Sequence, residues 1–100
     1  MSEVITNATI VGDEGGEYAR LIKTDSGELY YLKVFELDCD KLDDDKYEIL
    51  VFDACLPFNA NGKYQVDDIV CIELRYATFE AMLAAHLDLC EHLEDYIYEE

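Results

Sequence analysis

The pattern of apolar residues changes once along the chain, near Thr78, from the spacing of strands to the spacing of a helix. Before Thr78, β-branched, aromatic and other apolar residues gather in five short segments separated by turn-forming residues, a pattern that favours strands. These segments are residues 3–11, 17–24, 29–35, 47–56 and 64–76. After Thr78, apolar residues recur every three or four positions, which is the period of an amphipathic helix.

The predicted helix begins after Thr78, whose hydroxyl can cap it, and runs for about five turns. Its apolar stripe is predicted to contain Phe79, Met82, Leu83, His86, Leu87, Cys90, Leu93 and Ile97. Glycine-rich and Asn-Gly turns between the earlier segments suit hairpins, the first of them joining residues 3–11 to 17–24. The simplest architecture is an α+β single domain over residues 1–100, with about five antiparallel strands in hairpins and the C-terminal helix packed across the sheet.

The charge of the chain constrains its partners. It has 24 Asp and Glu residues against 7 Lys and Arg, a formal net charge of -17. A domain of this size is roughly 30 Å across, and the same length of B-DNA carries about 18 charges. Direct binding to nucleic acid or to an anionic membrane is therefore disfavoured, and a basic macromolecular partner is favoured.

A cytoplasmic location is expected, because no apolar run approaches a membrane span and residues 1–16 lack signal-peptide features.

Acidic residues of the predicted helix lie opposite its apolar stripe, with Glu80 at the start. The candidate partner-binding residues here are Asp88, Glu91, Glu94, Asp95, Tyr98 and Glu99. No Lys or Arg follows Arg75, so nothing relieves the repulsion among these acids or with the negative end of the helix dipole. The alternative is an ordinary solvated helix face. Tyr96 and Tyr98 are candidate hydrophobic anchors, although packing on the sheet is an equally good expectation for one of them.

A second set of acids lies between the third and fourth predicted strands, in a segment expected to be an exposed loop or one short helix. The candidate binding residues in it are Asp38, Asp40, Asp43, Asp44 and Asp45. An EF-hand counted from Asp38 fails, because Leu42, Asp43 and Ile49 occupy positions that need an oxygen ligand, a glycine and a bidentate glutamate. The segment is therefore either an acidic surface loop or a second binding patch, and no metal site is predicted.

Residue patterns typical of catalysis are scarce. Both histidines, His86 and His92, fall in the predicted helix, and phosphate-binding loops, nucleophile elbows and HExxH motifs are absent from the sequence. The four cysteines are widely spaced without a CxxC pair, which predicts reduced and mostly buried thiols. We expect no enzymatic activity, no catalytic residue, no cofactor and no metal.

The short length, the pI near 4, the small α+β plan and the acid-faced terminal helix ending LEDYIYEE resemble the DNA-mimic proteins encoded by phages, above all the anti-CRISPR inhibitors. The resemblance implies an inhibitor in the host cytoplasm that occupies the Lys and Arg residues with which a CRISPR surveillance complex holds target DNA. An immunity protein or antitoxin that neutralises a basic toxin such as a nuclease needs the same acidic face. The acidic surface of a halophile's protein is a third interpretation, and the sequence does not predict the oligomeric state.

Overall fold

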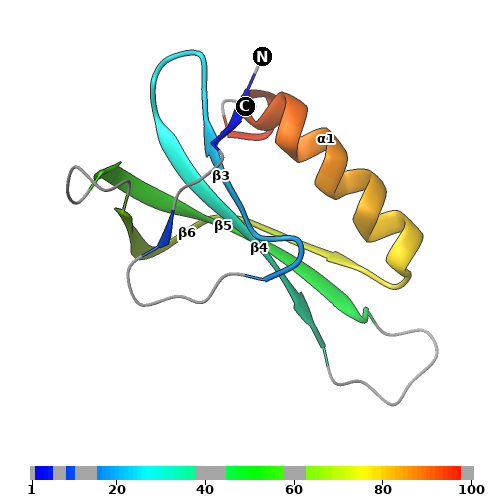
Figure 1. Ribbon diagram of the computed structural model, residues 1–100. Coiled ribbons are helices and arrows are strands. Elements are labelled where there is room, and N and C mark those ends of the chain that lie inside the picture. The colour runs from blue at the N-terminus through cyan, green and yellow to red at the C-terminus, as the bar shows by residue number, and fades with distance from the viewer. Residues whose placement is uncertain (1, 6–8, 11–15, 38–44, 58–62, 98–100) are drawn as a thin grey trace.

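The computed structural model describes residues 2–5, 9–10, 16–37, 45–57 and 63–97. Within these ranges the elements are β1 (Glu3–Ile5), β2 (Thr9–Ile10), β3 (Arg20–Lys23), β4 (Leu29–Glu36), β5 (Tyr47–Pro57), β6 (Lys63–Tyr76) and α1 (Phe79–Ile97). Figure 1 shows α1 lying along one face of the sheet, so the predicted α+β class is confirmed.

The strand order is β1-β3-β4-β5-β6-β2, and neighbours are antiparallel except for β2, which runs parallel to β6. The sequence predicts that residues 3–11 form one strand of a hairpin, whereas the structure divides them between the two edges of the sheet. Val4 of β1 lies opposite Ile22 of β3, as a hairpin requires, but Ile10 of β2 lies opposite Tyr64 of β6. The predicted hairpins of β3 with β4 and of β5 with β6 are present as antiparallel pairs.

The short link between β1 and β2 forces the sheet to curl. In a flat sheet of this strand order the two edges would be roughly 24 Å apart, since neighbouring strands lie about 4.8 Å apart. Ile5 and Thr9 are four positions apart, so the chain allows their Cα atoms a separation of at most about 15 Å. Leu21 and Tyr31, which pair on the face away from the helix, are accordingly buried inside the curled sheet.

The helix and the opposite face of the sheet form the main core. Its members are apolar residues that alternate along the strands or recur at helical spacing: Ile22, Tyr30, Leu32, Ile49, Val51, Met82, Leu89 and Leu93. The predicted cap is confirmed, since Thr78 Oγ1 accepts a hydrogen bond from the Ala81 N–H at 3.2 Å. Two members of the predicted stripe are wrong, because Leu87 is 58% exposed and Phe79 is 37% exposed. Leu89, which the predicted stripe leaves out, is fully buried.

Candidate functional site

The outer side of α1 carries a line of carboxylates. The buried side is set by Met82, His86, Leu89 and Leu93, and a helix advances about 100° per residue. Residues on the opposite side are therefore exposed, among them Glu80, Asp88, Glu91 and Asp95. We call these four residues the helix patch. The expected separation of acids from the buried stripe is thus present in the fold.

Asp88 has a partner within the helix. The Tyr96 hydroxyl donates a short hydrogen bond to Asp88 Oδ2, and this bond, together with burial, raises the pKa of Tyr96 to about 12. Burial and, after it, the Asp88 charge also raise the pKa of Tyr76. The Tyr96 ring packs against the core. Of the two roles open to Tyr96, the structure therefore supports packing rather than anchoring of a partner.

Glu94 holds the turn between β3 and β4 against the helix. Its Oε1 accepts a hydrogen bond of 2.9 Å from the backbone N–H of Asp25. The turn itself is closed by hydrogen bonds between Thr24 and Glu28, with Gly27 at a φ of 90°, a conformation that glycine adopts at little cost. Glu94 is half-buried, in contrast to its exposed neighbour Asp95. It therefore has a structural role beside the binding role predicted for it.

The C-terminal part of α1 has a break at His92, and Ser2 forms hydrogen bonds with the residues on both sides of this break. The backbone leaves helical geometry at His92, where φ is −132° and ψ is 41°. Ser2 Oγ accepts a hydrogen bond of 3.2 Å from the Leu93 N–H, and the Ser2 N–H donates one of 3.1 Å to the Glu91 carbonyl. Ser2, the residue before β1, thus acts as a capping residue for the backbone of α1 on both sides of His92.

The acid-rich segment between β4 and β5 lies largely outside the described residues. This applies to Asp38, Asp40, Asp43 and Asp44, and to Tyr98 and Glu99 after the helix. Asp45 is described and exposed. The base of the segment is closed by the Leu37 N–H, which donates a hydrogen bond of 2.8 Å to the Lys46 carbonyl.

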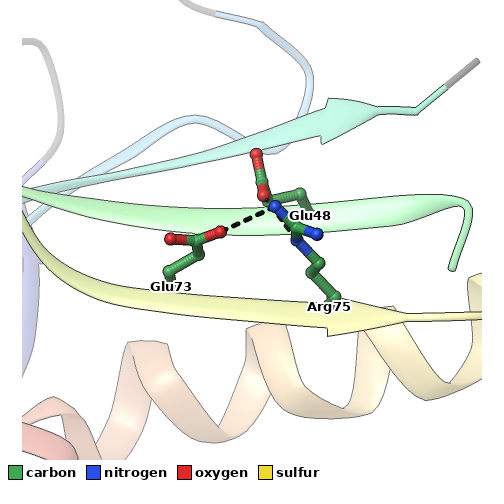
Figure 2. A network of polar contacts seen from close by, with 3 residues as sticks. All are labelled: Glu48, Glu73 and Arg75. Atoms are coloured by element: carbon green, nitrogen blue, oxygen red, sulfur yellow. Dashed lines mark hydrogen bonds and ion pairs between the residues drawn. The ribbon is translucent and has the colours of Figure 1, made fainter.

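Arg75, an exposed residue of β6, is paired with two carboxylates on the face of the sheet away from α1. Arg75 Nε donates to Glu48 Oε2 and Arg75 Nη2 donates to Glu73 Oε1, both at 2.9 Å. Figure 2 shows the three side chains and these contacts. These bonds raise the pKa of Arg75 further. Because Arg75 is matched by two carboxylates, it contributes no net positive charge to this face.

His86, which is buried, and Cys90, which is half-buried, lie next to each other on the inner side of the helix. The His86 Nε2–H donates to the Tyr18 carbonyl at 2.8 Å, and the Cys90 thiol lies 3.9 Å from His86 Nδ1. Burial lowers the pKa of His86 and raises that of the Cys90 thiol, so both groups are kept neutral. The expectation that His86 is a core residue is confirmed.

The prediction of buried thiols is wrong for Cys71. This residue is exposed on β6, and its thiol donates a hydrogen bond of 3.0 Å to Asp53 Oδ1 on β5. Partial burial and the bond to Asp53 raise its pKa to about 11. Among the described residues, no group of three or more His, Cys, Asp and Glu side chains is placed to hold a metal ion.

An aromatic cluster at the start of α1 was not predicted from the sequence. Phe79 packs edge to face against Tyr18 and Tyr47, with ring centroids 5.9 Å apart in each pair. These residues come from three separate segments, so no local spacing could have brought them together. The only signal was the high tyrosine content, eight residues in the chain.

Comparison with protein-family models, with curated proteins and with solved structures gave no match. In the part of the chain that the structure describes, α1 is not apolar enough to cross a membrane.

Proposed function

We propose that the protein is an inhibitor that presents the helix patch to a basic nucleic-acid-binding surface and occupies it in place of double-stranded DNA. The observation that carries the proposal is the one-sided charge of α1, where exposed carboxylates face outward and no Lys or Arg follows Arg75 in the chain. By the resemblance described above, the proposed partner is a bacterial defence complex such as a CRISPR surveillance complex. The proposed action is binding without catalysis, in the cytoplasm.

The density of charge on α1 supports this proposal. Glu80 and Asp95 are fifteen positions apart, which corresponds to roughly 22 Å of helix axis. With Glu94, the helix carries about one carboxylate per 5 Å, against one phosphate per roughly 3.4 Å along a single DNA strand. A basic groove shaped for DNA can therefore meet several of these carboxylates at once through charge-assisted hydrogen bonds.

The electrostatic cost of the arrangement also supports a role in binding. Carboxylates near the C-terminal end of a helix oppose its dipole, each by about 0.3–1 kcal/mol. Glu91 and Asp95 are exposed in this region, and the last turn of α1 contains no basic residue. Stability alone would favour Lys or Arg there. A cationic partner would remove this repulsion on binding.

The proposal can be tested by affinity capture from a bacterial lysate, with elution in a salt gradient and identification by mass spectrometry. The captured complex is then assayed for binding to its target DNA with and without the protein. We expect a DNA-binding assembly that elutes with salt and loses its DNA when the protein is added. A captured toxin would replace the proposal with the immunity-protein interpretation. A captured assembly that keeps its DNA would contradict mimicry.

A further inference from the structure

A cavity of about 280 Å³ lies between the N-terminal end of α1, strands β4 and β5, and the segment before β3. Its walls include the rings of Tyr18, Tyr47 and Phe79 and the acidic residues Glu17 and Glu36. The volume is slightly below the range of roughly 300–1,000 Å³ that is typical of small-molecule sites. It suits a single long side chain.

Tyr18, Tyr47 and Phe79, which line the cavity, come from three different segments of the chain. Phe79 is 37% exposed and stands between the two tyrosines, inclined by 63° to Tyr18 and by 67° to Tyr47. The face of an aromatic ring is negative, and a cation within about 6 Å of its centre is attracted. Several rings around one small volume therefore favour a cationic group over a neutral apolar one.

The wall formed by Tyr18 is held in place by the helix and by its own turn. The His86 Nε2–H donates to the Tyr18 carbonyl at 2.8 Å, and the two rings lie 5.6 Å apart. Arg20 Nη1 donates to the carbonyls of Glu17 and Ala19 at 2.9 and 2.8 Å. Because these contacts fix the wall before a ligand arrives, binding requires little further ordering.

Among the residues that line the cavity, the two carboxylates of Glu17 and Glu36 outnumber the one ammonium of Lys33. Glu17 and Glu36 are exposed, so their carboxylates can approach the charged end of an incoming side chain. Lys33 also lines the cavity, and its ammonium lies 5.5 Å from the centre of the Phe35 ring, outside the three-ring cluster. We propose that this cavity receives a lysine or arginine side chain of the basic partner. The inference rests on the proposed function for the source of that side chain, but its chemistry can be tested without the partner.

The test uses three blocked amino acids as probes: the N-acetyl methylamides of lysine, arginine and norleucine. Each is titrated into the ¹⁵N-labelled protein, and amide shifts are followed by NMR. We expect one or both cationic probes to shift the signals of residues 16–19 and 79–82, and norleucine, which has the same aliphatic chain without charge, to bind at least 3-fold more weakly. A comparison of lysine with arginine then identifies the preferred cation.

Two variants make the result specific. Glu17→Gln with Glu36→Gln is expected to weaken the cationic probe about 3-fold to 10-fold, and both sites are exposed, so the fold is retained. Glu91→Gln with Asp95→Asn removes the same charge from the far end of α1 and should leave probe binding unchanged.

Equal binding of norleucine, or shifts confined to the helix patch, would overturn the inference. Failure of the helix-patch variant to affect partner capture would count against the proposed function alone.

Discussion

Replacing Leu89 by Ala tests which side of α1 faces the sheet. Leu89 is fully buried in the core, one turn from both His86 and Leu93. Removing a buried leucine side chain costs about 2–5 kcal/mol, and a site with no exposure belongs to the upper part of this range. We therefore expect a loss of about 3 kcal/mol or more in the free energy of unfolding. In a domain of 60–100 residues this lowers the melting temperature by about 12–24 °C.

The matched control is Leu87→Ala, two positions earlier on the same helix. Leu87 is 58% exposed, and alanine is the better helix former, so we expect a change within about 1 kcal/mol. Urea unfolding followed by far-UV circular dichroism gives both free energies, and equal m-values would show that the compared states are the same. The reasoning would be refuted if Leu87→Ala were the more destabilising variant, because the helix would then bury the stripe that the sequence pattern predicts.

Three further predictions concern single groups. The pKa of His86 is lowered in the folded protein from its ordinary value of 6.5, so the unfolded chain binds more protons below that pH. The free energy of unfolding should therefore fall as the pH drops below 6.5. Urea titrations at several pH values should show a weaker pH dependence for His86→Gln. The Cys71 thiol, with a pKa of about 11 against an ordinary 9.0, should hold about 100-fold less thiolate at pH 8 than an unshifted cysteine; iodoacetamide should modify it slowly, and Asp53→Asn should make it faster, whereas an unchanged rate would contradict the role of Asp53. Ser2→Ala should cost about 1 kcal/mol by removing the hydroxyl that accepts from the Leu93 N–H, and an unchanged stability would show that water replaces it.

Local patterns in the sequence predicted the element types well. The β-branched and aromatic content of residues 29–35 and 47–56 and the helical period after Thr78 depend only on near neighbours along the chain, and the structure has β4, β5 and α1 at those places. The division of residues 3–11 between the two edges could not be predicted in this way. It depends on the pairing of Thr9 and Ile10 with Lys63 and Tyr64, which lie 54 positions further along the chain.

The candidate site was predicted in its outline but not in its contacts. Spacing along the helix placed Glu91 and Asp95 on the exposed side. The same spacing could not show that Glu94 binds the Asp25 backbone, because the two residues are 69 positions apart. Leu87 was misplaced because the apolar pattern fits two slightly rotated stripes, and packing against the sheet selects the one that buries Leu89.

The interrupted end of α1 connects the stability of the fold with the proposed binding surface. Ser2 and the turn at Asp25 contact Glu91, Leu93 and Glu94 on either side of the break at His92. These contacts hold the last acidic turn in place despite its unfavourable charge. A partner would thus meet carboxylates that are already positioned, which limits the entropy lost on binding.

The central claim is that the helix patch binds the partner. Its most direct test is the affinity of the captured partner, measured over a range of salt concentrations, for the wild-type protein and two variants of equal charge. One carries Asp88→Asn, Glu91→Gln and Asp95→Asn, and the amide introduced by the first of these substitutions keeps an oxygen acceptor for the Tyr96 hydroxyl. The other carries Asp40→Asn, Asp43→Asn and Asp44→Asn.

For the helix variant we predict an affinity at least about 10-fold weaker at moderate salt, with a shallower dependence on salt, because charge-assisted contacts are lost. The variant with substitutions at Asp40, Asp43 and Asp44 should change the affinity less than about 3-fold, through the general loss of negative charge. Binding that is unchanged in the helix variant, or reduced only in the loop variant, would contradict the account.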